Sequence, residues 1–197
     1  MLRSMRAVVQ QVPESWLAER ALLGQDRHDE IWEGVLHMVP AATYEHQMIG
    51  TKLVVFLEPR LLRGGIQVLY ETGVHRPGSA GKDYRIPDMV FFRDQPGLIV
   101  ERGLEGAPIA VLEIRSPDDE TYEKFDFWAR LGVAEIIVIV PESRAVEVYR
   151  IAGDRYVAAP ADASGAVHAT TIDVRFRTLA AEPPRLQVEH LGEQVTI

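Results

Sequence analysis

The fold is decided by residues 86–140, which read IPDMVFFRDQPGLIVERGLEGAPIAVLEIRSPDDETYEKFDFWARLGVAEIIVIV. Three segments in this stretch are apolar enough to form buried strands: IPDMVFF (86–92), PIAVLEIR (108–115) and EIIVIV (135–140). The polar segment between the last two predicts a helix that ends at Gly132. A helix between two strands of one sheet makes them parallel, so we expect a mixed, covered sheet with EIIVIV at its centre.

The flanking sequence extends this core in both directions. We expect a short helix at 15–24, a strand or hairpin arm at 31–39, and a long helix from an N-cap at Thr43 to about Arg63. Further strands are expected at 66–74, 145–150, 155–159 and 171–176.

The expected architecture is therefore α/β. Its core follows the order helix, three strands, helix, strand over about 43–150. An N-terminal helix and strand arm (13–40) and extra antiparallel C-terminal strands (145–178) complete a single domain of residues 1–197.

Composition excludes several classes of protein. The chain has no cysteine, which rules out disulfides and thiol chemistry and favours a cytoplasmic location. No apolar run is long enough to span a membrane. The net charge of −8 argues against a dedicated nucleic-acid-binding module but not against an enzyme that acts on nucleic acid, because metal-binding carboxylates themselves add negative charge.

Two acids are expected in neighbouring strands. Glu113 lies in the middle of PIAVLEIR, where an isolated carboxylate is costly to bury unless it is paired or bound to a metal. Asp88 holds a similar mid-strand position one strand earlier, and two such acids would repel each other unless a cation lay between them. The structural alternatives are a salt bridge from Glu113 to Arg115 or Lys124, and an Asp88 that only shapes the start of its strand.

Three further residues could serve the same site. Lys124 lies on the expected helix, where it either pairs with Glu120 in solvent or turns its ammonium toward the acids. Glu45 and His46 begin the long helix, and one of them could supply a metal ligand or proton acceptor, although a histidine there is more often a packing or capping residue.

The segments IPDMVFF, APIAVLEIRSP and EKFDFWARLGVAEIIVIVPESRAVEVYR together resemble the Uma-type family. Its members are bacterial proteins classed as restriction endonuclease-like, within the PD-(D/E)XK nuclease superfamily. The resemblance spans roughly residues 29–178 and implies the restriction endonuclease-like core already expected from the residue patterns.

This resemblance also implies a site. It makes Asp88 and Glu113 metal ligands, with the carbonyl of Ile114 as a third ligand, and Mg²⁺ or Mn²⁺ as the cofactor. The superfamily lysine follows the second acid by two residues, and Arg115 occupies that position here. The lysine function would then move to Lys124, as is usual in this family.

The first interpretation is a metal-dependent endonuclease that hydrolyses phosphodiester bonds in nucleic acid, with DNA as the expected substrate. The alternative is a catalytically inactive, nuclease-like scaffold that acts as a binding or regulatory module. A third interpretation is a hydrolase of small phosphorylated ligands. Strands such as 145–150 could pair across a homodimer.

Overall fold

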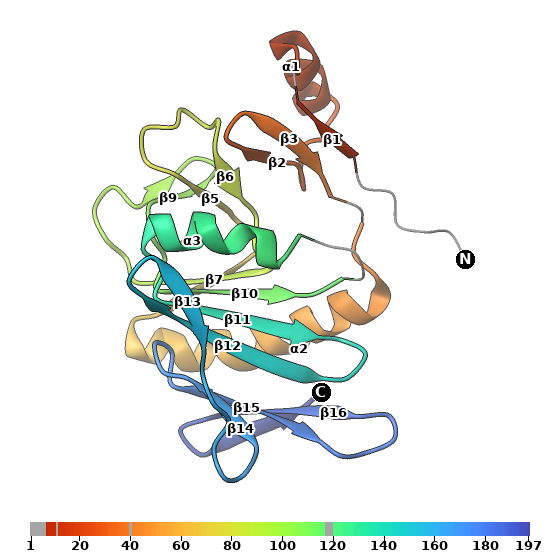
Figure 1. The fold of residues 1–197 in the computed structure, drawn as a ribbon, viewed down its shortest axis with the longest axis vertical. Coiled ribbons are helices and arrows are strands. Elements are labelled where there is room, and N and C mark those ends of the chain that lie inside the picture. Colours follow the sequence, from red (N-terminus) through yellow and green to blue (C-terminus); the bar gives the residue numbers. More distant parts are fainter. Residues whose placement is uncertain (1–6, 11, 40, 117–119) are drawn as a thin grey trace.

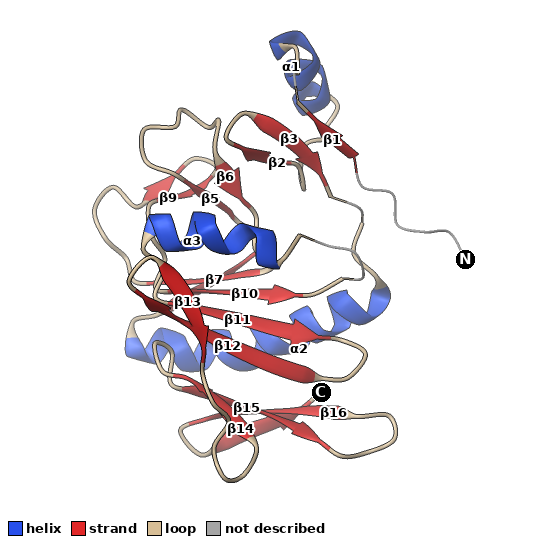
Figure 2. Cartoon of the chain, viewed as in Figure 1, coloured by secondary structure: helices blue, strands red, loops and turns tan. Residues whose placement is uncertain are grey.

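A mixed six-stranded sheet forms the centre of the molecule (Figure 1; Figure 2). The strand order is β13 (Arg155–Ala158), β12 (Ala145–Ala152), β11 (Glu135–Val140), β10 (Ala110–Ile114), β7 (Met89–Phe92) and β4 (Gln67–Tyr70). This computed structural model describes residues 7–10, 12–39, 41–116 and 120–197. Strands β10 and β11 are parallel and the other neighbours are antiparallel, which confirms the predicted mixed sheet.

Helix α2 (Tyr44–Leu61) covers one face of this sheet and continues as the 3-10 turn η1 (Leu62–Gly64). The Thr43 hydroxyl accepts a hydrogen bond from the backbone N–H of His46, so the predicted N-cap is present. Gly65 ends the segment in the left-handed conformation, which glycine adopts without strain. The helix buries one stripe of side chains: His46, Ile49, Leu53, Phe56, Leu57 and Leu61.

The opposite face is covered by the 3-10 turn η2 (Tyr122–Lys124) and helix α3 (Phe125–Leu131). Phe127 and Trp128 are buried against the sheet, and Gly132 ends the helix in the left-handed conformation. The predicted start of this helix at 117–119 lies outside the described residues.

A second sheet lies beyond α3. Helix α1 (Glu14–Leu22) lies between the first two strands of this sheet in the sequence. The prediction of one strand at 66–74 is wrong, because the chain leaves the central sheet at Glu71, whose φ is 46°, and enters this second sheet. The predicted hairpin arm is present and turns at Glu33-Gly34. The strand order is β1 (Ala7–Val9), β3 (Val35–Met38), β2 (Glu30–Trp32), β6 (Tyr84–Arg85), β5 (Gly73–His75), β9 (Gly103–Glu105) and β8 (Ile99–Val100).

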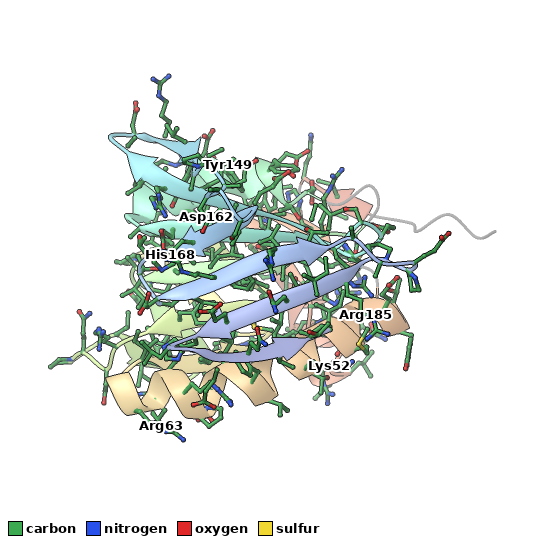
Figure 3. All side chains as sticks on the ribbon, turned by 90° about the horizontal axis from the view of Figure 1, so that it is seen from below. Lys52, Arg63, Tyr149, Asp162, His168 and Arg185 are labelled. Carbon is green, nitrogen blue, oxygen red and sulfur yellow. The ribbon has the colours of Figure 1, made fainter. Side chains whose placement is uncertain are left out.

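The C-terminal residues form a third, antiparallel sheet of β14 (Ala166–Ala169), β15 (Val174–Leu179), β16 (Arg185–His190) and β17 (Glu193–Thr196). Figure 3 looks onto this sheet, with His168 on β14 and Arg185 at the start of β16. The strand predicted at 171–176 begins only at Val174, because Thr170 and Thr171 hydrogen-bond to the buried Glu135 instead of a neighbouring strand.

Two apolar clusters hold these layers together. One joins α2, the central sheet and the C-terminal sheet; the other joins α3, the central sheet and the second sheet. Strand β12 has neighbours on both sides, so the strand predicted to pair across a dimer is not at an edge; the edge strand there is β13. In the described part of the chain, no helix is both long and apolar enough to cross a membrane.

Candidate active site

Asp88 and Glu113 lie opposite each other at one end of the central sheet. Asp88 directly precedes β7 instead of lying mid-strand, which corrects the sequence expectation, and Glu113 is in β10. The antiparallel register pairs Leu112 with Met89, so one further step places Glu113 across from Asp88. Val111 belongs to the cluster under α3, and alternation assigns Glu113 in β10 to that same face.

Lys124 turns into this face instead of toward solvent. Its Nζ lies 3.2 Å from Glu113 Oε1 and 2.9 Å from Glu30 Oε1 in β2. Burial lowers the pKa of the ammonium, but the charges of Glu113 and Glu30 outweigh it, so the pKa lies above its ordinary value. The lysine is therefore a fixed positive charge.

Glu113 has an unusual electrostatic environment. Burial raises the pKa of its carboxyl to about 8, the ammonium of Lys124 opposes this rise, and the carboxylates of Asp88 and Glu30 add to it. Three carboxylates thus surround one ammonium. A further cation at this point would favour the ionised form of Glu113.

His46 holds Asp88 from the side of α2. Its Nε2 lies 3.1 Å from Asp88 Oδ1, while the backbone N–H of Ile114 donates to Asp88 Oδ2 at 2.6 Å. Burial lowers the pKa of the imidazole, but the hydrogen bond to Asp88 and the charges of Asp88 and Glu71 raise it above its ordinary value, helped by the carbonyl of Ile114. Both oxygens of Asp88 are therefore oriented.

Three residues considered in the sequence analysis have other partners. Glu45 forms an ion pair with Arg144 at 2.8 Å, and nearly half of its side chain is exposed. Arg115 is exposed, with its guanidinium over the ring of Tyr122, 5.5 Å from the ring centroid. Glu120, expected beside Lys124, instead contacts His37 at 2.8 Å.

Two acids near the site, Glu30 and Glu71, are not among the residues predicted from the sequence. Glu30 is 1% exposed and contacts Lys124, and the signal that could have revealed it is an acid directly before the alternating segment at 31–39. Glu71 accepts a hydrogen bond from the Gln47 amide at 3.0 Å, and its backbone N–H donates to the carbonyl of Asp88. Glu71 reaches this position because its backbone φ is positive, which its residue type does not predict.

The donor atoms fit Mg²⁺ or Mn²⁺. Among the described residues, no group of three or more His, Cys, Asp or Glu side chains is arranged to hold a metal. Two carboxylates and a carbonyl nevertheless suffice for Mg²⁺, which prefers oxygen ligands and keeps several waters. Asp88, Glu113 and the carbonyl of Ile114 offer oxygen donors of this kind, and the pKa of Glu113 is raised by burial first and then by the charges of Asp88 and Glu30.

A comparison with family models places these residues in context. The model of Uma2, described as "Putative restriction endonuclease", matches residues 14–175, which include every residue of the site. The chain belongs to the Uma2 family. This Uma2 chain also resembles a solved structure. That structure is described as "a putative nuclease belonging to DUF820 from Anabaena variabilis ATCC 29413", and it superposes on this chain with a TM-score of 0.59.

That structure shares 19% sequence identity, and the match covers 73% of this Uma2 chain and 83% of the other. At this identity the likeness shows the fold, which confirms the predicted α/β nuclease-like core with its extra antiparallel strands. A comparison with curated proteins finds no match.

Proposed function

We propose that this Uma2 protein is a metal-dependent endonuclease that hydrolyses phosphodiester bonds in nucleic acid. The observation that carries the proposal is the buried contact between Lys124 and Glu113 at the end of the sheet where Asp88 lies. Two acids and a lysine in one place are what the PD-(D/E)XK chemistry requires. They come from three different elements, so their convergence is not a local accident of sequence.

Asp88, Glu113 and the carbonyl of Ile114 would hold Mg²⁺ or Mn²⁺. When bound, such an ion lowers the pKa of a water and polarises the phosphate. His46 and the N–H of Ile114 orient the two oxygens of Asp88, which preserves the ligand geometry.

Lys124 supplies a positive charge for the transition state. Because its pKa is raised, it is not a general base at neutral pH. It would therefore stabilise the negative charge that develops on the phosphate, or orient the attacking water. Arg115 cannot replace it as a base either, since guanidinium does not lose its proton in proteins, but its exposed side chain could bind a flanking phosphate.

The test is incubation with supercoiled, linear and single-stranded DNA and with RNA, each with Mg²⁺ or Mn²⁺ and with EDTA. We expect metal-dependent cleavage, with DNA as the preferred substrate. Lys124→Ala should abolish cleavage while Mn²⁺ binding, measured by calorimetry, is retained. Arg115→Ala is the comparison variant, and it should raise KM with little change in kcat. Cleavage by Lys124→Ala at the parental rate would refute the role of Lys124.

A second candidate function is a nuclease-like scaffold without catalysis. It is favoured by one observation: the residue two positions after Glu113 is an exposed arginine paired with a ring instead of a lysine. A scaffold need not keep a metal site. Failure to cleave any substrate, together with failure to bind Mn²⁺, would therefore favour the scaffold.

A further inference from the structure

Glu30 is one of the most deeply buried charged residues in the described part of the chain. It lies in β2, in the sheet beyond α3, and is 1% exposed. A buried carboxylate is stable only when its oxygens are satisfied by donors or by an opposite charge. The partners of Glu30 therefore indicate why it is there.

Both oxygens of Glu30 are used. Oε1 receives the ammonium of Lys124 at 2.9 Å and the backbone N–H of Ile86 at 2.8 Å, and Oε2 receives the indole N–H of Trp32 at 2.7 Å. Ile86 precedes Asp88 by two residues. A single oxygen thus connects Lys124 to the chain segment that positions Asp88.

We propose that Glu30 is a positioning residue of the active site, which holds the ammonium of Lys124 and the segment before Asp88 in a fixed relation. The proposal rests on the proposed function and assigns a task to the N-terminal hairpin. Glu30 is enclosed by β2, the segment between β6 and β7, and the Lys124 side chain, so it would act through Lys124 and not by contact with a bound phosphate.

Glu113 has two proposed roles, as the partner of Lys124 and as a metal ligand. Lys124 therefore needs a second carboxylate. If Glu113 alone paired with Lys124, engaging a metal ion would weaken the only partner of a buried ammonium. Leaving a buried charge without its partner is strongly destabilising. With Glu30 in place, Lys124 keeps a carboxylate while Glu113 is free to act as a ligand.

A purely structural role for Glu30 makes different predictions. In that case its bonds to Ile86 and Trp32 would matter, and removing its charge would lower stability without changing turnover by the folded protein. In Glu30→Gln the amide oxygen can still accept from Ile86, but the negative charge facing Lys124 and the acceptor for the Trp32 indole are both lost. Turnover by the folded protein, and not its stability, therefore separates the two roles.

Glu33→Gln is a matched control. Glu33 lies on the same hairpin and pairs with a cation of α3, Arg130, at 2.9 Å, but both side chains of this pair are exposed, whereas Glu30 and Lys124 are buried. Both variants remove one negative charge from one hairpin. Any general effect of charge or of hairpin stability should therefore appear in both.

The experiment compares the parent, Glu30→Gln and Glu33→Gln by two readouts. Steady-state cleavage gives kcat and KM, and NMR of protein labelled with ¹⁵N-lysine follows the Lys124 ammonium, which is protected by burial. We expect Glu30→Gln to lower kcat about 10- to 100-fold with little change in KM, the effect of a misplaced catalytic group. The Lys124 resonance should shift or broaden. Glu33→Gln should match the parent in both readouts.

Parental kcat and an unchanged Lys124 resonance in Glu30→Gln would overturn the proposal, as would an equal loss of kcat in Glu33→Gln. If Glu30→Gln does not fold, Glu30→Asp takes its place, because it keeps the charge but shortens the reach; an unchanged resonance in Glu30→Asp would also overturn the proposal. If the parent cleaves no substrate, the endonuclease proposal fails, whereas the NMR comparison alone still decides whether Glu30 positions Lys124.

Discussion

His46 is bound to Asp88 as a charged partner, which makes the stability of the site depend on pH. The folded-state pKa of the imidazole is raised. A raised pKa contributes stability that is fully present below the unfolded-state value, about 6.5, and is lost as the pH rises through the folded-state value. This stability therefore falls as the pH rises, whereas the stability from a paired carboxylate falls as the pH drops.

We predict that His46→Gln destabilises the metal-free protein, and that the difference from the parent shrinks as the pH rises above about 6.5. Urea unfolding in EDTA measures this difference at each pH. His28→Gln is the control, because its ring is half exposed and lies 3.9 Å from Glu71. A difference that stays constant or grows with pH would show that His46 is not held in its charged form.

At the scale of elements, the C-terminal sheet is attached to the central sheet through Glu135 at the start of β11. Its carboxylate accepts hydrogen bonds from the backbone and hydroxyl groups of Thr170 and Thr171 and from Arg150. Burial raises the pKa of Glu135, but these donors, Thr171 first, outweigh it, so the pKa is lowered. The stability from this contact is present above about pH 4.5 and is lost as the pH falls through the folded-state pKa.

We predict that Glu135→Gln lowers the free energy of unfolding by about 2 kcal/mol at neutral pH, as for the loss of charge-assisted hydrogen bonds. The loss should diminish in acid, because the parent carboxylate then becomes protonated. Urea titrations at neutral and acidic pH measure both values. Glu142→Gln, an exposed acid in the next loop, should have no effect; an equal loss in that variant would contradict the assignment.

Elements with local signals could be predicted from the sequence. The N-cap at Thr43, the glycine after α3 and the parallel pair β10–β11 each follow from residues close in sequence. Of the predicted site residues, Asp88, Glu113 and Lys124 were named from two apolar strands, one polar segment and the family resemblance, and the structure brings Lys124 to Glu113 at the end of the sheet where Asp88 lies. The contact of Glu30 with Lys124 was not, since periodicity says nothing about which layer a distant hairpin packs against.

At the scale of the whole molecule, a metal bound at the end of the sheet should stabilise the entire fold. A ligand that binds only the folded state adds about 2.7 kcal/mol at a hundredfold excess over Kd. Asp88 and Glu113 belong to β7 and β10 or their ends, which are interior strands of the central sheet. Global unfolding therefore has to release the metal.

We predict that saturating Mn²⁺ raises Tm by about 5–10 °C in the parent. The rise should vanish in Glu113→Gln and persist in Glu123→Gln, which changes an exposed acid of η2. Thermal scans with and without Mn²⁺ provide the measurement. An equal rise in Glu113→Gln would place the metal elsewhere.

The distribution of the site along the chain has a consequence for biosynthesis. Glu30, His46, Asp88, Glu113 and Lys124 come from five separate segments, and β10 completes its parallel pairing only with β11, which ends at Val140. A chain emerging from the ribosome folds from its N-terminus. A nascent chain that stops before residue 120 has both acids but no Lys124. Under the proposed function, such an unfinished chain lacks the ammonium that cleavage requires, so activity would wait until the chain beyond β10 has been made.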